Sequence, residues 1–189
     1  MILEGIVTTI NREGELNIAP MGPVVDPEMT HLVLRPFETS RTFSNLKETR
    51  CGVFHVVDDV LLLAKAAIGL LEEIPKTFPA EHISGAVLQS SCRWYEFQIE
   101  SIDETEQRSE MQAKVIHFGR IRDYFGLNRA KHAVLEAAIL ATRTHITEQI
   151  ELEAQYRALA EIVKKTAGPE EQAAFELLEE YISKAYVKA

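Results

Sequence analysis

The chain has 189 residues, of which 46% are hydrophobic and 26% charged, and its formal net charge is -9. Enough apolar side chains are present to bury a core, which excludes a disordered chain, and the acidic balance excludes general nucleic-acid binding, which needs a basic surface. The N-terminus lacks a signal-peptide pattern and no apolar run is long enough to span a bilayer, so we expect a soluble, cytoplasmic protein without membrane contact.

The first 23 residues predict a β-hairpin that ends at a proline-rich corner. Residues 2–10 are rich in β-branched side chains, residues 11–15 are turn formers, and residues 16–19 resume a strand. The corner Pro20-Met21-Gly22-Pro23 is predicted to end the strand, because proline cannot donate to a β-ladder. Gly22 lets another group approach the backbone closely, and the alternative is a plain turn.

A strand–helix–strand segment follows, with residues 31–35, 40–49 and 51–57 in those roles. The helix opens with Thr39-Ser40-Arg41-Thr42, and Arg35 lies just before it. A helix start offers unpaired N–H groups and the positive end of the helix dipole, which together favour an anion. Residues 34–48 carry three basic and two acidic side chains in an otherwise acidic chain. Two interpretations stay open: a phosphate site, or an ordinary N-cap beside solvated arginines.

The middle of the chain continues with one helix and three strands. Residues 60–71 have apolar side chains at helical spacing after the capping pair Asp58-Asp59. Residues 75–81 read as a polar connection, and residues 85–92, 93–102 and 111–118 as strands, with a hairpin loop at 103–110. In 93–102, apolar Tyr95, Phe97 and Ile99 alternate with polar residues, which predicts a half-buried strand. About seven strands with short helices between them suit a small, mostly antiparallel barrel.

From residue 128 onward the sequence is helical. Helices are expected at 128–148, 150–165 and 170–187, with Gly168-Pro169 at the last junction. The predicted domains are therefore 1–127 and 128–189. A polar set on the first of these helices is either a salt-linked surface face or a cluster in a cleft beside the barrel that could bind an anionic substrate: Arg129, His132, Glu136 and Arg143.

Several familiar chemical motifs are missing. The sequence has no GxGxxG after its first strand, no GxxxxGK[ST], no HExxH and no GxSxG. Cys51 and Cys92 lack the spacing of a zinc site and read as buried free thiols, so no metal site is predicted. No catalytic side chain stands out, and any redox chemistry would need a bound cofactor.

The whole stretch 2–150 resembles a known family. The segments LEGIVTT, INREGELNIAPMGPVV and LVLRPFETSRTFSNLKETRCGVFHVVDD are similar to the domain of unknown function 447 family, which is related to flavin reductases and pyridoxamine-phosphate oxidases. Thr42-Phe43-Ser44-Asn45 matches the Thr-x-x-Asn helix of that superfamily. The resemblance implies an FMN-binding split β-barrel, mainly β with α, followed by a C-terminal helical appendage.

The resemblance also implies a cofactor, its contacts and an assembly. FMN would place its phosphate on Thr39, Ser40, Arg41 and Thr42 with Arg35 nearby, and its ring along Ala19, Pro20, Met21 and Gly22. Asn45 would organise the helix or touch the flavin. A homodimer is implied, with Trp94 helping to cover the flavin at the interface.

Three functions fit these expectations. The first is an FMN-dependent oxidoreductase acting on a small-molecule redox substrate of unknown identity. The second is a non-catalytic module that binds or carries a flavin or another phosphorylated ligand. The third is a partner-binding protein that acts through its helical tail.

Overall fold

A computed structural model describes residues 1–105 and 109–187, which form two compact units. The barrel unit comprises Met1–Val57 and Ile74–Tyr124, and the helical unit comprises Asp58–Glu73 and Phe125–Ala189. This division differs from the predicted boundary at 127/128, because residues 58–73 group with the C-terminal helices. Among the described residues, no helix is both long and apolar enough to cross a bilayer.

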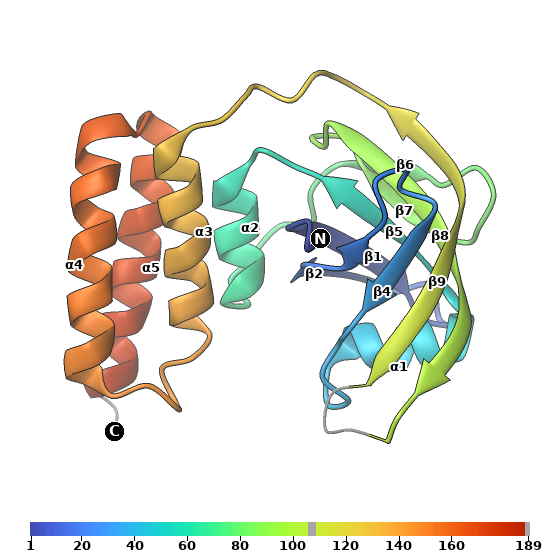
Figure 1. Cartoon of the computed structure of the whole chain (residues 1–189), viewed down its shortest axis with the longest axis horizontal. Helices are drawn as coiled ribbons and strands as arrows, with labels where there is room; N and C mark the ends of the chain where they lie inside the picture. Colours follow the sequence, from blue (N-terminus) through green and yellow to red (C-terminus); the bar gives the residue numbers. More distant parts are fainter. Residues whose placement is uncertain (106–108, 188–189) are drawn as a thin grey trace. The chain divides into compact units, whose positions relative to one another are not determined.

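The barrel unit is built on one curled antiparallel sheet (Figure 1). Its described strands lie in the order β2-β1-β5-β8-β9-β4-β3. Their bounds are Gly5–Ile10 (β1), Leu16–Met21 (β2), Val24–Val25 (β3), His31–Leu34 (β4), Cys51–Val56 (β5), Arg93–Asp103 (β8) and Glu110–Arg120 (β9). The chain just before β1 bridges β3 through Ile2 and Val24, which curls the edge strand β3 toward β1. The predicted fold class, a split β-barrel with a C-terminal helical appendage, is confirmed.

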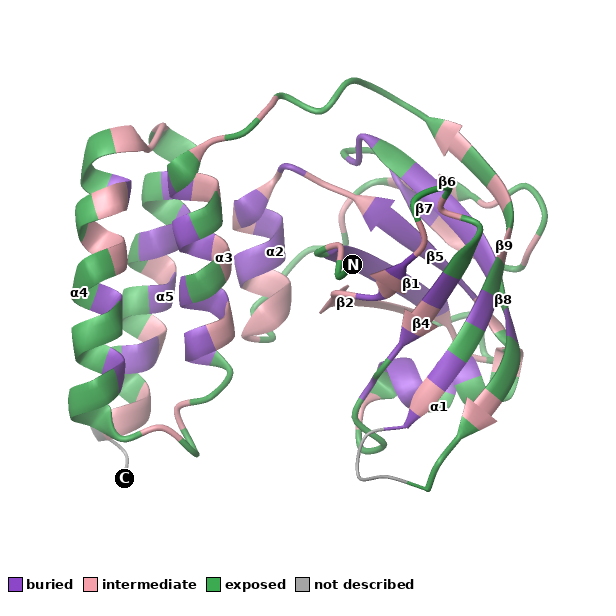
Figure 2. Cartoon of the chain, viewed as in Figure 1, coloured by how far each residue is buried: buried purple, intermediate pink, exposed green. Residues whose placement is uncertain are grey.

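The inner face of the sheet packs against helix α1 (Arg41–Thr49). Phe43 and Leu46 of α1 share one core cluster with Tyr95, Phe97 and Ile99 of β8, the side chains whose alternation predicted this face. β1 and β5 are mostly buried and β8 is buried mainly in its first half, whereas β2 is only partly buried along its whole length (Figure 2).

The outer face of the sheet carries a second hairpin that the sequence did not predict. β6 (Thr77–Pro79) and β7 (Ala86–Leu88) pair with each other, and Val87 packs with Val53 and Trp94 in a second cluster. The residues 75–81 read as a connection because a strand of three residues that ends in proline has almost no periodic signal.

A buried histidine fixes this hairpin to the sheet. Nε2 of His55 accepts a hydrogen bond from the backbone N–H of Leu88 at 3.1 Å, so Nδ1 carries the proton and donates to the carbonyl of Ile6 at 3.1 Å. Burial lowers the pKa of His55 to about 4. His55 is therefore a neutral structural side chain at pH 7.

The helical unit consists of α2 (Val60–Ala67), α3 (Arg129–Ala141), α4 (Gln149–Thr166) and α5 (Pro169–Val187). α2 packs on α3 and α5, and α3 also packs on α4. The Lys131 Nζ of α3 pairs with the Glu171 Oε1 of α5 at 3.0 Å, and both side chains are largely buried. α3 ends at Ala141, seven residues earlier than expected, and its capping residue is Asn128.

Candidate functional site

Ser40 is the N-cap of α1. Its backbone is extended and its Oγ accepts a hydrogen bond from the N–H of Phe43 at 3.1 Å. The first N–H groups of a helix have no intrahelical acceptor, and Ser40 satisfies only that of Phe43. The cap and the anion site are thus compatible, because the N–H groups of Arg41 and Thr42 still point out of the helix start.

Thr42 and Asn45 attach this helix start to the first hairpin. The amide nitrogen of Asn17 donates to Thr42 Oγ1 at 3.0 Å and to Thr9 Oγ1 at 3.3 Å, and the amide nitrogen of Asn45 donates to Thr9 Oγ1 at 3.0 Å. Thr42 and Asn45 are both buried. Asn45 therefore organises the helix, which is one of the two roles considered from the sequence, and the hydroxyl hydrogen of Thr42 is still free to donate.

The two arginines of the predicted phosphate site differ in their surroundings. Arg35 donates through Nε and Nη2 to Glu110 Oε2, at 3.1 and 2.9 Å, in a solvent-exposed ion pair. Arg41 is exposed and has no ion pair with any of the described residues. Thr39 is exposed and Ser40 is partly exposed. Arg41 is thus the freer of the two cations at the helix start.

The corner predicted to carry a ligand ring belongs to the edge strand β2. β2 continues through Pro20 to Met21, beyond the predicted end at residue 19, because an edge strand tolerates a residue without an N–H. Asn17, Ala19 and Met21 alternate onto one face, and Met21 packs against the inner core. Through Asn17 this face of β2 adjoins the start of α1.

Gly22 has a structural explanation within the chain. A Cβ at this position would lie 2.6 Å from the carboxylate oxygen Oε1 of Glu4, so a larger residue would require the end of the Glu4 side chain to move. The close approach inferred from the sequence is therefore made by Glu4.

Trp94 lies away from the start of α1 of its own chain. Its ring packs edge-on against Phe78 at 5.4 Å on the outer face of the sheet, and its Nε1 donates to Glu96 Oε1 at 3.3 Å. The ring also lies over Gly119, where a Cβ would come within 2.0 Å of it. α1 packs on the inner face, so Trp94 and the α1 start lie on opposite faces of the sheet.

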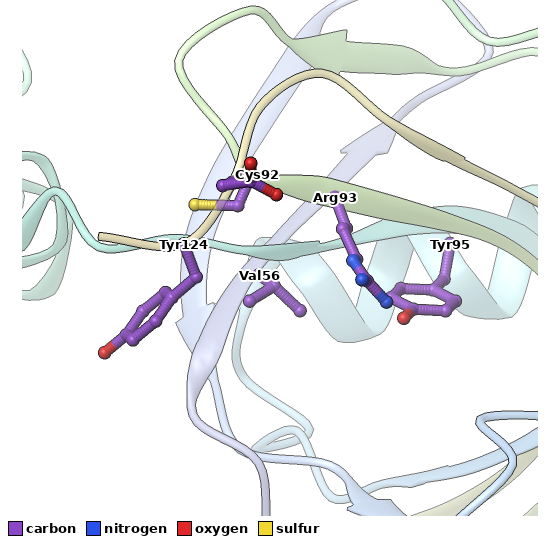
Figure 3. Close-up of a pocket in the computed structure, with 6 residues that line it drawn as sticks. Val56, Cys92, Arg93, Tyr95 and Tyr124 are labelled. Carbon is purple, nitrogen blue, oxygen red and sulfur yellow. The ribbon is translucent and has the colours of Figure 1, made fainter. Parts of the chain in front are cut away.

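The structure adds a cavity of about 470 Å³ that no sequence motif indicated (Figure 3). Its lining residues come from the end of β5, the start of β8 and the segment after β9: Val56, Cys92, Arg93, Tyr95, Asp123 and Tyr124. That size suits a small organic ligand. Three separate segments supply the lining, which is why no local pattern pointed to it.

The polar set predicted on the first C-terminal helix does not form a site, and Arg143 lies beyond the end of α3. All four side chains are exposed, namely Arg129, His132, Glu136 and Arg143. No ion pair joins them in the described part of the chain. The surface position is as expected, but the expected salt links are absent among the described residues.

Family models match the chain over nearly its whole length. The model "Protein of unknown function (DUF447) N-terminal domain" matches residues 3–122, and the model "Protein of unknown function (DUF447)" matches residues 128–180. The chain belongs to the DUF447 family. The comparison with curated proteins finds no significant match.

Solved structures place this DUF447 chain among flavin proteins by fold. An FMN-bound protein of the DUF447 family from Methanosarcina mazei is 25% identical, with a TM-score of 0.81 over 95% of this chain and 94% of that one. A flavin reductase complexed with NADP+ is 18% identical, with a TM-score of 0.54 over 66% of this chain and 83% of that one. Flavoredoxin from Methanosarcina acetivorans is 11% identical, with a TM-score of 0.54 over 63% and 68%. The last two similarities concern the fold alone.

Proposed function

We propose that this chain binds FMN and acts as a flavin-dependent oxidoreductase on a small redox substrate. The observation that carries the proposal is the start of α1, which carries unpaired N–H groups, the hydroxyls of Ser40 and Thr42, and the exposed Arg41. The N–H groups and the guanidinium can only donate hydrogen bonds, and the hydroxyls can also donate. Such a set of donors suits a phosphate dianion. The FMN-bound family member from M. mazei supports the choice of ligand.

The chain's own residues would hold the two ends of the cofactor. Thr39, Ser40, Arg41 and Thr42 would bind the phosphate, and Arg35 would join them by exchanging its exposed partner Glu110. An exposed ion pair contributes at most about 1 kcal/mol, so this exchange costs little. The partly buried end of β2 at Ala19, Pro20 and Met21, with Gly22 beyond it, would lie along the ring. FMN would supply the hydride or electron transfer.

We also propose a homodimer in which the second copy helps to enclose the ring. β2 is an edge strand and only partly buried, so one chain leaves the proposed ring surface open. Trp94 of the second copy is the candidate cover, since Trp94 of the same chain lies on the other face of the sheet. Light scattering at micromolar concentration should give twice the chain mass, and a monomer that retains flavin would contradict the dimer.

The spectrum of the purified protein tests flavin binding. We expect a yellow protein that releases FMN on denaturation, and an apoprotein that quenches the fluorescence of added FMN in a one-to-one titration. A colourless protein that does not quench FMN fluorescence would overturn the proposal.

Turnover separates the oxidoreductase from the carrier. An oxidoreductase should bleach under a nicotinamide donor and regain its colour in air or with an added acceptor. A flavoprotein that stays yellow under every donor would favour the carrier.

A further inference from the structure

Three metal-ligating side chains meet on the outer face of the barrel unit. Glu81, His82 and His117 each place one ligand atom within 4.8 Å of the other two. Nε2 of His117 lies 3.5 Å from Oε2 of Glu81, and the rings of His82 and His117 are 4.4 Å apart between centroids. We propose that these residues bind one divalent transition-metal ion of the zinc class.

The spacing suits a tetrahedral ion. Bonds of about 2.0–2.1 Å to nitrogen and oxygen put two tetrahedral ligands about 3.4 Å apart. The separation of His117 and Glu81 already has this value, at 3.5 Å. The Glu81 side chain is 58% exposed, so it can rotate to complete the coordination without disturbing the core.

A buried carboxylate positions two of the three ligands. Glu96 is fully buried and accepts hydrogen bonds from the backbone N–H groups of Glu81 and His82, both at 2.8 Å. Its register partner on β9 is His117, the third ligand. Such outer groups commonly fix the ligands of protein metal sites.

Charge and ligand type indicate the ion. In the described part of the chain, neither Glu81 nor Glu96 pairs with a lysine or arginine, so a cation would balance two carboxylates. Two imidazoles and one carboxylate suit zinc, copper, iron or nickel better than calcium or magnesium. Three protein ligands leave a fourth position for water. His82 also lines an open cavity of about 360 Å³, which gives the ion a route from solvent.

The ion would join two elements that are distant in the chain. Glu81 and His82 lie in the turn between β6 and β7, whereas His117 lies on β9. Bound metal would therefore fasten the β6–β7 hairpin to the sheet. The sequence predicted no metal site because two adjacent residues and one distant histidine form no recognisable motif. This inference does not depend on flavin binding.

Calorimetric titration of ZnCl2 into chelator-treated protein without a histidine tag tests the proposal. We expect one Zn²⁺ per chain and at least ten-fold weaker binding in each of Glu81→Gln and His117→Ala. His145→Ala, which removes an exposed histidine of the helical unit, is the matched control and should bind as the wild type does. Excess Mg²⁺ should not compete.

Thermal unfolding with and without Zn²⁺ provides the second measurement. At one Zn²⁺ concentration, the unfolding midpoint should rise more in the wild type and in His145→Ala than in Glu81→Gln, whose exposed position leaves the metal-free fold intact. Absence of Zn²⁺ binding, or binding that either ligand substitution leaves unchanged, overturns the three-ligand site.

Discussion

The side-chain amide of Asn17 donates a hydrogen bond to the hydroxyl of Thr42 at 3.0 Å, across 25 positions of sequence. Asn17 lies on β2, the strand proposed to lie along the flavin ring, and Thr42 lies in the first turn of α1, proposed to bind the phosphate. The two ends of the proposed cofactor site are therefore held in a fixed relation by this chain before any ligand binds. Preorganisation of this kind favours affinity because fewer groups must be ordered on binding.

Arg41→Ala should weaken FMN far more than riboflavin. A hydrogen bond to a charged group contributes about 1.5–3 kcal/mol, which corresponds to roughly ten- to a hundred-fold in affinity. Riboflavin lacks the phosphate, so its weaker binding should hardly change. Fluorescence titration of both ligands into apoprotein measures the difference. Lys47→Ala, which removes a base from the last turn of the same helix, is the control, and equal weakening of both ligands by Arg41→Ala would contradict the phosphate assignment.

Asn45→Ala should lower the free energy of unfolding. The substitution removes the buried donor to Thr9 Oγ1 and leaves space beneath α1. Loss of a buried hydrogen-bond partner costs about 1–3 kcal/mol. Urea unfolding of the apoprotein measures the change. Ser44→Ala removes only an exposed bond on the same helix and should cost much less, and a similar loss in both variants would mean that the buried bond to Thr9 is not responsible.

His55 should make the protein less stable between about pH 6.5 and pH 4. Burial lowers the pKa of His55 from 6.5 to about 4. In this pH range His55 is therefore protonated in the unfolded chain but neutral in the folded chain. The contribution of His55 to the free energy of unfolding is constant above the pKa of the unfolded chain. It falls as the pH drops between the two pKa values and levels off below the pKa of the folded chain. The full loss is about 3 kcal/mol at 1.36 kcal/mol per pKa unit.

Unfolding free energies of wild type and His55→Gln over this pH range check the expectation. The variant should show a shallower dependence, whereas His31→Gln, at an exposed position, should keep the wild-type slope. Identical slopes for His55→Gln and wild type would place the pH dependence elsewhere.

Glu171→Gln should destabilise the helical unit at pH 7. Burial alone would raise the pKa of Glu171, but hydrogen bonds from Lys131 and from the Gly168 N–H outweigh it and hold the pKa below 4.5. The substitution leaves the charge of Lys131 largely buried, at a cost of about 3 kcal/mol, the lower end for breaking a buried pair.

The difference between wild type and Glu171→Gln should shrink as the pH falls below the ordinary carboxyl pKa, since a lowered pKa stabilises only above that range. Chemical denaturation at pH 7 and at pH 3.5 measures both values. Glu161→Gln, which breaks an exposed pair with Lys165, should cost less than about 1 kcal/mol. A difference that persists undiminished in acid would show that packing, and not charge, is lost.

Sequence patterns predicted the parts of the fold that depend on neighbouring residues, such as strand alternation and helix capping. The alternation of Tyr95, Phe97 and Ile99 gave the inner face of β8, and the hydroxyl of Ser40 gave the start of α1. Glu96 reads as a solvent-facing residue of the same strand, yet it is fully buried. Its burial needs the N–H groups that the β6–β7 hairpin brings over the outer face, and no periodicity in the sequence encodes that arrangement.

The candidate site shows the same division. The helix start with Arg41 could be found from residue types, because capping and dipole effects act within one turn. The face occupied by Trp94, the pairing of Arg35 with Glu110 and the contact of Gly22 with Glu4 depend on strand order and register. These are properties of the assembled sheet, so the sequence alone could not assign them.

The position of α2 in the helical unit means that the chain passes between the two units three times, after residues 57, 73 and 124. The helices therefore do not form a detachable tail. A protein cut after residue 127 would keep α2 without its packing partners α3 and α5, and would expose its apolar side chains to water. We expect that fragment to aggregate on expression, whereas limited proteolysis of the intact chain should leave fragments that co-migrate until denaturant is added. A fusion protein that uses the barrel unit would therefore have to include α2 and the two connections on either side of it.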